Sequence, residues 1–357
     1  MNKLTIIVTY YNAEEYITGC LESIKQQRTQ DFNLIIVNDG STDQSKKLMD
    51  EAIKDYDKNI RFIDLDENSG HAHARNIALE EVETPYFMFL DADDEFLPSR
   101  IDFMADYYQQ DDNVDIVIGQ IGREKDGDWQ TIYSHQAIQK IDKVNLAQCP
   151  DMMQSIGPGA KMFNAKFADL RFDEDVVFCE EHTFIVNAYI KAHDIQLLPD
   201  IVYGYNEQEG SVTDQRADQF ASYMQDAVKV RARVMDTLLL RESRIYYSYR
   251  MDELIVSYLL QSYIEKHDII TQQLLDLVIA YMMEMQKTDY DGAAMFRIVK
   301  VIEQGSKKWN KTLYQQWRDT LLKVGIGRPN YYRFKAEILP KRARFRGRMK
   351  LKQILNR

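Results

Sequence analysis

The chain has 357 residues, of which 45% are hydrophobic, and this composition supports a sizeable core and more than one folded unit. Its 22 tyrosines and 15 phenylalanines exclude disorder over the whole length. Its three cysteines, Cys20, Cys149 and Cys179, are too few and too far apart for a disulfide framework or a CxxC zinc site, which favours a reducing compartment.

No apolar run reaches the ~20 residues that a membrane-spanning helix needs. The chain begins Met1-Asn2-Lys3-Leu4 and passes directly into a strand-like segment, without the cleavage region of a signal peptide. We therefore expect a cytoplasmic protein.

The first 120 residues alternate between short apolar runs and stretches with helical spacing. The apolar runs begin at residues 4, 32, 60, 86 and 114, so successive starts are 28, 28, 26 and 28 residues apart. Residues 13–26, 45–57 and 72–82 have the spacing of amphipathic helices. This alternation predicts an α/β fold, with a mostly parallel sheet covered by helices on both faces.

Polar residues follow each of the first four apolar runs. Ligands of parallel sheets lie beyond the carboxyl ends of the strands, so we expect these residues to meet at one edge. In chain order they are Thr9-Tyr10-Tyr11-Asn12, Asn38-Asp39-Gly40-Ser41, Asp66-Glu67-Asn68-Ser69-Gly70 and Asp91-Ala92-Asp93-Asp94.

After the second run, Asp39 can accept the N–H of a base or bind a ribose hydroxyl, and Gly40 allows a tight turn. Acidic residues and serines also favour helix N-caps. We expect Asp43 or Ser45 to cap the next helix while Asp39 faces a ligand.

After the third run, Arg75 offers a fixed fork of donors that suits a diphosphate or a base carbonyl. His71 and His73 are two residues apart, do not share a helix face and have no nearby cysteine, so a zinc site is not expected. We interpret both histidines as surface or loop residues.

After the fourth run, Asp91 and Asp93 form a DxD motif that Asp94 follows. Mg²⁺ and Mn²⁺ prefer oxygen ligands and often bind one or two carboxylates together with substrate phosphates. Taken alone, the motif fits equally an acidic turn that caps the helix near Ser99. Its place at the end of a buried strand favours a metal and diphosphate site.

The residue composition and the spacing of apolar residues change after Asp214. No proline occurs between Pro199 and Pro329, no glycine occurs between Gly210 and Gly292, and the apolar positions have helical spacing. We predict a first domain over residues 1–214, a helical unit over 215–327 and a basic tail over 328–357.

The formal net charge of −11 is unevenly distributed. Residues 328–357 hold eleven basic residues and a single acid, so this tail carries +10 and the other residues carry −21. Such a tail gains ~1 kcal/mol per charge at an anionic membrane surface, which predicts peripheral attachment at the inner face of the plasma membrane. An anionic glycopolymer or a disordered, solubilising role are the alternatives, and nucleic acid is not expected because the acidic body repels it.

Six blocks of the chain, together with a closing loop, resemble in order and spacing the inverting family 2 glycosyltransferases with the GT-A fold. The first four are VTYYNAEEYITGCLESI, IIVNDGSTDQS, ENSGHAHARNIAL and YFMFLDADDEF. Gly159-Ala160-Lys161-Met162-Phe163 and the stretch from Arg171 to Phe184 resemble two later segments, and Tyr203 to Thr213 resembles a closing loop. The resemblance covers roughly the first 215 residues and implies the family's Rossmann-like GT-A domain, followed here by a helical C-terminal unit.

The resemblance also implies roles for individual residues. Asp93 would ligate Mg²⁺ or Mn²⁺, Asp91 would contact the ribose or the metal, and Glu181 would be the general base that deprotonates the acceptor, with Glu180 in reserve. The other residues expected to bind the nucleotide sugar, some of them more weakly indicated, are Thr9, Tyr11, Asp39, Asn68, Arg75, Ala92, Lys161 and Ser211.

Four positions depart from the family pattern. Thr9 replaces a proline, Asn38 the first of two aspartates and Asn206 a frequent arginine. Glu181 stands where aspartate is common, and its extra methylene moves the carboxylate by roughly one bond length, which affects attack geometry.

We expect an inverting transferase that moves a sugar from a nucleotide diphosphate, a UDP-sugar by preference, to a hydroxyl of a cell-surface glycan, glycopolymer or glycolipid. Tyr331-Tyr332-Arg333-Phe334 faintly resembles the extension of wall-teichoic-acid transferases. A catalytically silent nucleotide-sugar or glycan-binding protein is the alternative, and a homo-oligomer remains open. A pyrophosphorylase would need a glycine-rich loop where the chain has Tyr10-Tyr11-Asn12.

Overall fold

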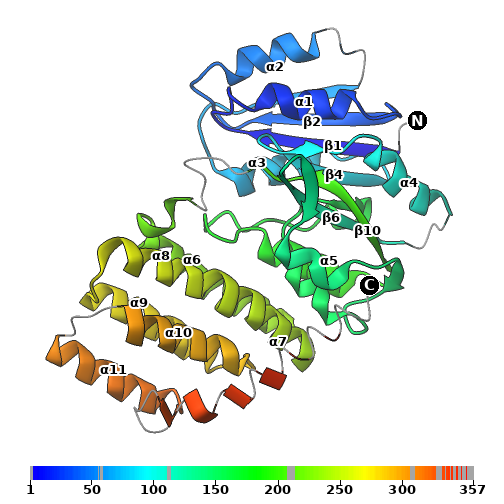
Figure 1. Ribbon diagram of the computed structural model, residues 1–357. Coiled ribbons are helices and arrows are strands. Elements are labelled where there is room, and N and C mark those ends of the chain that lie inside the picture. The colour runs from blue at the N-terminus through cyan, green and yellow to red at the C-terminus, as the bar shows by residue number, and fades with distance from the viewer. Residues whose placement is uncertain are drawn as a thin grey trace. The chain divides into compact units, whose positions relative to one another are not determined.

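The computed structural model divides into two compact units, a first that takes in Met1–Gln208 and a second of Glu209–Leu355 (Figure 1). The division predicted at residues 214 and 327 stays a prediction. The structure describes residues 3–54, 56, 59–110, 114–206, 214–305 and 310–326, and of the tail residues 332, 333, 335–337, 339, 340, 343, 344, 347 and 351.

The first unit is built on a ten-stranded sheet in which the order of the main path is β3-β2-β1-β4-β9-β6-β10-β5, with β7 paired to β6 and β8 to β10. The strands are β1 (Leu4–Tyr10), β2 (Phe32–Asn38), β3 (Ile60–Asp64), β4 (Tyr86–Asp91), β5 (Glu95–Phe96), β6 (Ile116–Lys125), β7 (Asp128–Thr131), β8 (Asp142–Val144), β9 (Lys161–Asn164) and β10 (Ile195–Gly204).

The half of the sheet that begins the chain is parallel throughout. Strand β1 pairs in parallel with β2 and β4, and β2 pairs in parallel with β3. Strand β9 is antiparallel to both β4 and β6, while β6 and β10 are again parallel. The predicted α/β sheet is therefore confirmed, but it is mixed and not mostly parallel: β9 lies antiparallel inside it, and β5, β7 and β8 also pair antiparallel.

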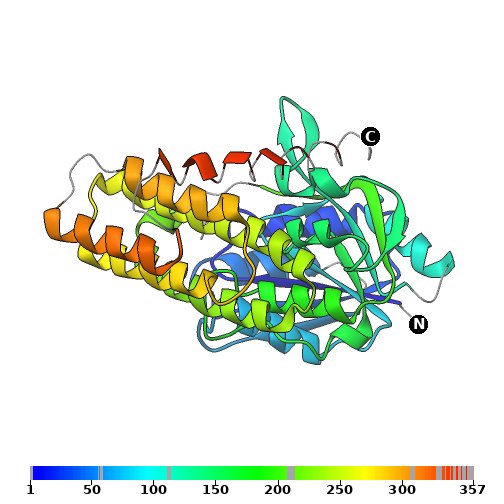
Figure 2. The same ribbon diagram turned by 90° about the horizontal axis from the view of Figure 1, so that it is seen from below.

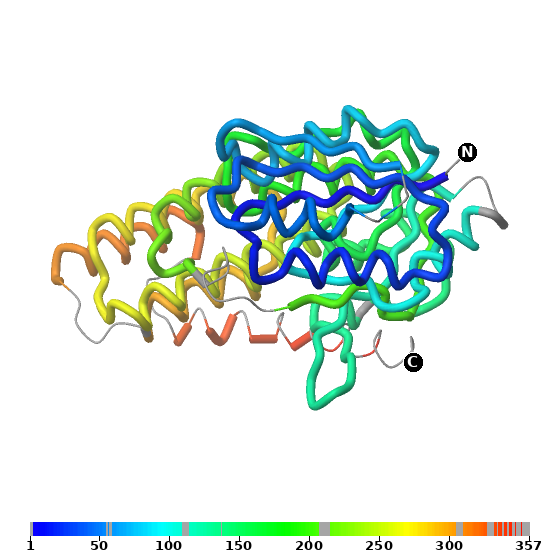
Figure 3. The backbone as a smooth tube through the Cα atoms, turned by 90° about the horizontal axis from the view of Figure 1, so that it is seen from above, coloured from blue at the N-terminus to red at the C-terminus, as the bar shows by residue number. Residues whose placement is uncertain are grey.

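Helices cover both faces of this sheet. They are α1 (Ile17–Lys25), α2 (Ser45–Ile53), α3 (His71–Glu80), α4 (Arg100–Gln110) and α5 (His182–Lys191). Helices α1 and α2 lie side by side (Figures 1 and 3). On the opposite face, the Phe89 ring of β4 contacts Phe184 of α5 with ring centroids 6.0 Å apart, and Arg75 of α3 lies 5.9 Å from the same ring.

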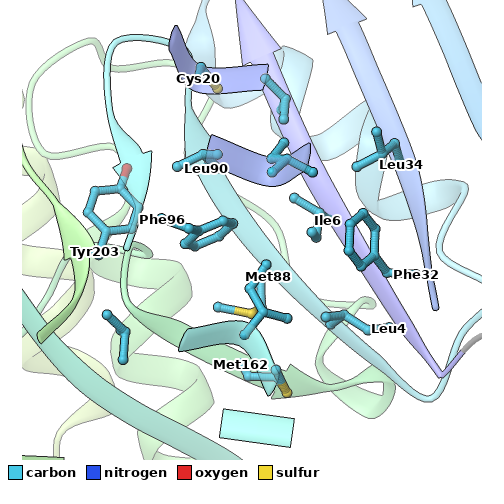
Figure 4. Close-up of a cluster of buried hydrophobic side chains, with 14 of the residues drawn as sticks. Leu4, Ile6, Cys20, Phe32, Leu34, Met88, Leu90, Phe96, Met162 and Tyr203 are labelled. Carbon is cyan, nitrogen blue, oxygen red and sulfur yellow. The ribbon is translucent and has the colours of Figure 1, made fainter. Parts of the chain in front are cut away.

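The core between the sheet and α1, α2 and α4 follows from the alternation of side chains along the strands. Leu4, Ile6 and Val8 of β1 point into it, together with Met88 and Leu90 of β4 (Figure 4). These side chains are at most 6% exposed. Burial of several such residues, each worth about 1.5–3 kcal/mol, fixes the strand ends from which the polar turns project.

The second unit is helical, as predicted, and its helices pack side by side (Figures 1 and 2). They are α6 (Phe220–Thr237), α7 (Arg241–Ser248), a π-helix (Tyr249–Val256), α8 (Ser257–His267), α9 (Gln272–Met285), α10 (Gly292–Gly305) and α11 (Lys311–Lys323). None of the helices that the structure describes is long and apolar enough to cross a membrane.

A buried ion pair joins three elements of the helical unit. The Arg231 Nε of α6 lies 3.0 Å from Oδ1 of Asp252 on the π-helix, and both side chains have no exposed surface. Ser248 and Tyr281 donate to the same carboxylate at 2.5 Å each. A buried charge needs such a full set of partners, so this cluster fixes the packing of α6, α9 and the π-helix.

Candidate active site

The ends of β1, β2 and β4 bring the predicted donor residues to one edge of the sheet. Thr9 is the register partner of Asp91, and Tyr10 is the partner of Asn38. Thr9 is 4% exposed, whereas Tyr11, which directly follows β1, is 46% exposed. The residues predicted after these three strands therefore lie beside one another.

The turn after β2 lies against the loop that leads into α3. Asp39 accepts the backbone N–H groups of Ser69 at 2.8 Å and Gly70 at 2.9 Å. Gly40 has a φ of +65°, and a Cβ built there would lie 2.4 Å from the backbone carbon of Glu67. The buried Asp39 carboxylate therefore ties this loop in place, and the adjacent Asn68 is exposed.

Asp43 holds the first residue of the helix after this turn, whose N-cap residue, Gln44, makes no side-chain capping bond. The Asp43 carboxylate accepts the backbone N–H of Ser45 at 3.0 Å and its hydroxyl at 2.6 Å, while the Ser45 hydroxyl accepts the N–H of Ala13 at 2.7 Å. These bonds lower the pKa of Asp43 although burial opposes the shift. Asp39 and Asp43 thus have separate tasks within one turn.

Arg75 joins two carboxylates that are far apart in the sequence. Its Nη2 donates to Asp91 Oδ1 at 2.6 Å, and its Nη1 lies 3.5 Å from Glu180 Oε1. The guanidinium also lies 5.1 Å from the centre of the Phe172 ring, and the buried Nε has no hydrogen-bond partner in the described structure. This arrangement brings the DxD turn and the predicted base segment into one site.

His71 reaches the same two carboxylates from the solvent side. Its Nε2 lies 3.5 Å from Asp91 Oδ1 and its Nδ1 lies 3.7 Å from Glu180 Oε1, and the side chain is 44% exposed. His71 and Arg75 are four residues apart on α3 and so share a helix face. The interpretation of His71 as a surface residue missed this placement, which the i, i+4 spacing to Arg75 could have indicated.

The three aspartates of the acidic turn have different electrostatic surroundings. Burial opposes ionisation of Asp91, but Arg75 and His71 outweigh it and hold the pKa of this carboxyl well below its ordinary value. Burial and the Asp91 charge raise the pKa of Asp93. Burial together with the charges of Asp91 and Asp93 raises the pKa of Asp94 to about 8.

Glu180 and Glu181 precede α5 and are hydrogen-bonded to each other. Burial and the neighbouring Glu181 charge raise the pKa of Glu180 well above its ordinary value. Glu181 occupies the N-cap position of α5, yet its side chain makes no capping hydrogen bond. The Glu181 carboxylate is therefore not used to cap the helix. The Glu181 side chain is also the more exposed of the two, at 24% against 14% for Glu180.

Cys179, directly before this pair, has a φ of +65°. A left-handed conformation at a residue with a side chain costs roughly 1–2 kcal/mol. Backbone of this kind is retained where the surrounding structure enforces it, and such positions cluster at functional sites.

Three other predicted residues have less direct placements. The fully buried Lys161 ammonium donates to the Ser155 hydroxyl at 2.8 Å and to the Gly157 carbonyl at 2.6 Å, so it holds the loop before β9. Ala92 is buried in the core beside β1 and β4, which leaves its backbone for any ligand contact. Ser211 lies outside the described residues.

The acidic turn suits a divalent cation that a substrate completes. Among the described side chains, no group of three or more His, Cys, Asp and Glu residues could hold a metal by itself. Burial, and then the Asp91 charge, raise the pKa of Asp93, and a nearby cation would favour its ionised form again. Asp93, with Asp91 beside it, fits a Mg²⁺ or Mn²⁺ whose remaining ligands are phosphate oxygens and water.

Comparison with known proteins agrees with this architecture. The model of glycosyl transferase family 2 matches residues 5–175. TagX of Staphylococcus aureus strain MSSA476, named as a glycosyltransferase, is 31% identical over 98% of this chain and 100% of its own length. The teichoic acid poly(glycerol phosphate) polymerase of Staphylococcus epidermidis is 86% identical over 114 residues, which are 32% of this chain and only 16% of that protein.

The fold is also that of a solved structure. TarS of S. aureus, residues 1–349 in complex with UDP, has a TM-score of 0.64 and 17% sequence identity over 89% of this chain and 91% of its own. The matching family model and the full-length similarity to TagX show that the chain belongs to glycosyl transferase family 2.

Proposed function

We propose that this protein is an inverting glycosyltransferase that moves a sugar from a UDP-sugar to a hydroxyl of a cell-surface glycopolymer of the teichoic acid type. The contact of Arg75 with both Asp91 and Glu180 carries this proposal. It places Asp91, which would lie near the diphosphate, beside Glu180, which directly precedes the proposed base. The UDP complex of TarS and the names of the relatives support the donor and the acceptor class.

In the proposed reaction Glu181 takes the proton of the acceptor hydroxyl while the hydroxyl oxygen forms a bond to the anomeric carbon. The bond from that carbon to the diphosphate breaks on the opposite face, its electron pair leaves with the nucleotide, and the configuration inverts. A carboxylate placed for such a proton transfer contributes typically ~10²–10⁴-fold to the rate. Glu181 fits the base better than Glu180 because Glu180 already contacts Arg75.

The other residues of the edge would bind and orient the donor. Thr9, Tyr11 and Asp39 would border the nucleoside, and Arg75 would approach the diphosphate. Asp93 would hold Mg²⁺ or Mn²⁺, and such a cation, when bound, neutralises charge that develops on the leaving diphosphate.

We further propose that the basic tail brings the enzyme to an anionic surface. Eleven basic residues on a body of charge −21 give the molecule two electrostatically distinct parts. Anionic lipid and an anionic glycopolymer would both attract the tail.

The proposal is tested with purified full-length protein, Mn²⁺ and a panel of UDP-, GDP- and dTDP-sugars. We expect UDP-sugars to raise the melting temperature most, because a ligand that binds only the folded state stabilises it. Glu181→Gln should lower sugar transfer by ~10²–10⁴-fold, and Asp93→Asn should remove the Mn²⁺-dependent part of UDP binding.

Glu124→Gln is the matched control, because Glu124 is an exposed acid in the hairpin of β6 and β7. Its turnover should equal that of the wild type. Equal signals from the wild type, Glu181→Gln and Asp93→Asn would show that the protein binds nucleotide sugars without transferring them.

A further inference from the structure

We infer that Tyr203 and Asn206, at the end of β10, are positioning residues that hold the acidic turn of residues 91–94 and thereby the Asp93 carboxylate. The consequence for catalysis rests on the proposed function, because the turn matters to a donor diphosphate and its cation only in a transferase. The contacts by which these two residues hold the turn are a property of the fold and do not depend on that function. We call residues 203–206 the strap.

Asn206 makes two hydrogen bonds to the turn. Its side-chain Nδ2 donates to the backbone carbonyl of Asp93 at 3.1 Å, and its backbone N–H donates to Asp94 Oδ1 at 2.9 Å. The Asp93 carboxylate accepts from its own backbone N–H, so the backbone of the turn sets its direction. The Asn206 bonds hold the backbone carbonyl of Asp93 and the side chain of the next residue, Asp94, and so restrict where the Asp93 carboxylate points.

Tyr203 holds the first residue of the same turn. Its hydroxyl accepts the backbone N–H of Asp91 at 3.2 Å and is hydrogen-bonded to the Asp94 carboxyl. The ring lies 5.9 Å from that of Phe96 in an edge-on contact, and a Cβ built on Gly159 would approach it to 3.1 Å. The ring is therefore enclosed, and its hydroxyl stays over the turn.

The strand that leaves the turn is held by the strap as well. Strand β5 pairs antiparallel with β10, in the register Tyr203 with Phe96 and Gly204 with Glu95. A Cβ on Gly204 would lie 2.5 Å from the Trp129 ring and 2.8 Å from the Glu95 side chain, so glycine permits the close approach of β10 to both. The acidic turn is thus fixed at its start, its middle and its exit by one short segment more than a hundred residues away.

The strap also links the turn to the loop before β9. Lys161 donates to the carbonyls of Gly157 and Gly159, and Gly159 packs on the Tyr203 ring. Lys161 therefore supports the acidic turn through this loop and through Tyr203.

The test compares Tyr203→Phe and Asn206→Ala with Tyr108→Phe. Tyr203→Phe removes one oxygen and leaves the ring packing. Tyr108 is an equally buried control, 2% exposed, whose hydroxyl donates to the carbonyls of Asp115 and Met162 and does not touch the turn. Two properties are measured in full-length protein: hydrogen–deuterium exchange of the amides of residues 91–96, and UDP affinity by calorimetry with Mn²⁺ and with EDTA.

We expect Tyr203→Phe and Asn206→Ala to speed exchange across the turn and to weaken UDP binding about five-fold in Mn²⁺, the loss that one ordinary hydrogen bond represents. Binding in EDTA should change little, because the nucleoside contacts remain. Tyr108→Phe should alter neither property.

If both strap variants exchange their turn amides at the wild-type rate, Tyr203 and Asn206 do not hold the acidic turn. Faster exchange with unchanged Mn²⁺-dependent affinity, or an equal loss in Tyr108→Phe, would overturn the positioning role. If Mn²⁺ adds nothing to UDP binding by the wild type while exchange still changes, the cation part of the proposed function fails and the hold stands.

Discussion

Glu180 and Glu181 are chemically identical neighbours whose surroundings differ. Glu180 contacts Arg75 and His71, and burial raises its pKa well above the ordinary value, which favours the neutral form. Glu181 is more exposed and makes no capping bond at the start of α5. Environment therefore separates the two carboxyls into a structural acid and a candidate base.

This separation predicts unequal effects of the same substitution. Glu180→Gln keeps an uncharged group with an oxygen for Arg75, so turnover should stay within about ten-fold of the wild type. Glu181→Gln removes the proton acceptor and should cost ~10²–10⁴-fold. Steady-state kcat and KM for both variants at one pH measure the two losses. A larger loss of turnover in Glu180→Gln than in Glu181→Gln would make Glu180 the base.

Sequence reasoning predicted that the proposed donor residues meet at one sheet edge because each polar turn follows an apolar strand at a regular spacing. The sequence could not indicate the partners of Arg75, because Asp91 and Glu180 are 16 and 105 positions away and only the folded chain brings them together. Tyr203 and Asn206 were assigned no role for the same reason. Ser211 and most of the tail lie outside the described residues, so those predictions stay open.

At the scale of elements, the turn after β2 and the loop before α3 behave as one part. Gly40 sits in a left-handed conformation directly on the backbone of Glu67, and the neighbouring Asp39 binds the N–H groups that open α3. At Gly40 the two backbones lie in direct contact. A change in one must displace the other.

Gly40→Ala should therefore damage both stability and nucleotide binding. A Cβ at this residue meets backbone at 2.4 Å, in addition to the roughly 1–2 kcal/mol cost of a left-handed alanine. We expect UDP affinity to fall by at least about ten-fold, which corresponds to ~1.4 kcal/mol. Calorimetry and thermal unfolding measure the two effects.

Gly127→Ala is the control, since Gly127 also has a positive φ, of +86°, but nothing lies within 4 Å of a Cβ there. It should lose stability only through its backbone and should bind UDP normally. Equal binding by the two alanine variants would show that the contact between Gly40 and Glu67 does not support the nucleotide site.

The strands that the sequence predicted are those with continuous apolar runs. Strand β9 has four residues and begins with a buried lysine, so its pattern gives no periodic signal. Strand β10 contains Pro199, and its register with β6 shifts after Leu197. In the helical unit, the lack of proline and glycine predicted helices, but nothing in the spacing predicted the π-helix around Asp252.

At the scale of the whole molecule, charge is divided between an acidic body and a basic tail. The residues before Arg328 carry −21 and those from Arg328 onward carry +10. At physiological salt such charges act over about 8 Å, so the tail attracts only surfaces that it can approach closely.

Neutralising part of the tail should therefore release the protein from anionic vesicles. We expect a variant with four arginines replaced by glutamine to bind phosphatidylserine-containing vesicles at least about a hundred-fold more weakly, at ~1 kcal/mol per charge. The substituted residues are Arg342, Arg344, Arg346 and Arg348.

A control variant removes as many positive charges from exposed lysines elsewhere and should sediment with vesicles as the wild type does. Its substituted residues are Lys47, Lys54, Lys311 and Lys323. Loss of binding in both variants would mean that total charge, not the tail, governs attachment. Retention in both would exclude an electrostatic contact with the bilayer.

The reversed direction of β9 has a consequence for how this scaffold can diversify. Because β9 runs against β4 and β6, the connector that precedes it, and not one that follows it, arrives at the edge where β1, β2 and β4 end. The turns after β1 and β2 belong to other connectors, whereas the turn after β4 meets this one through Gly159 and Tyr203. Insertions or deletions in this single incoming stretch of chain should therefore act first on the acidic turn.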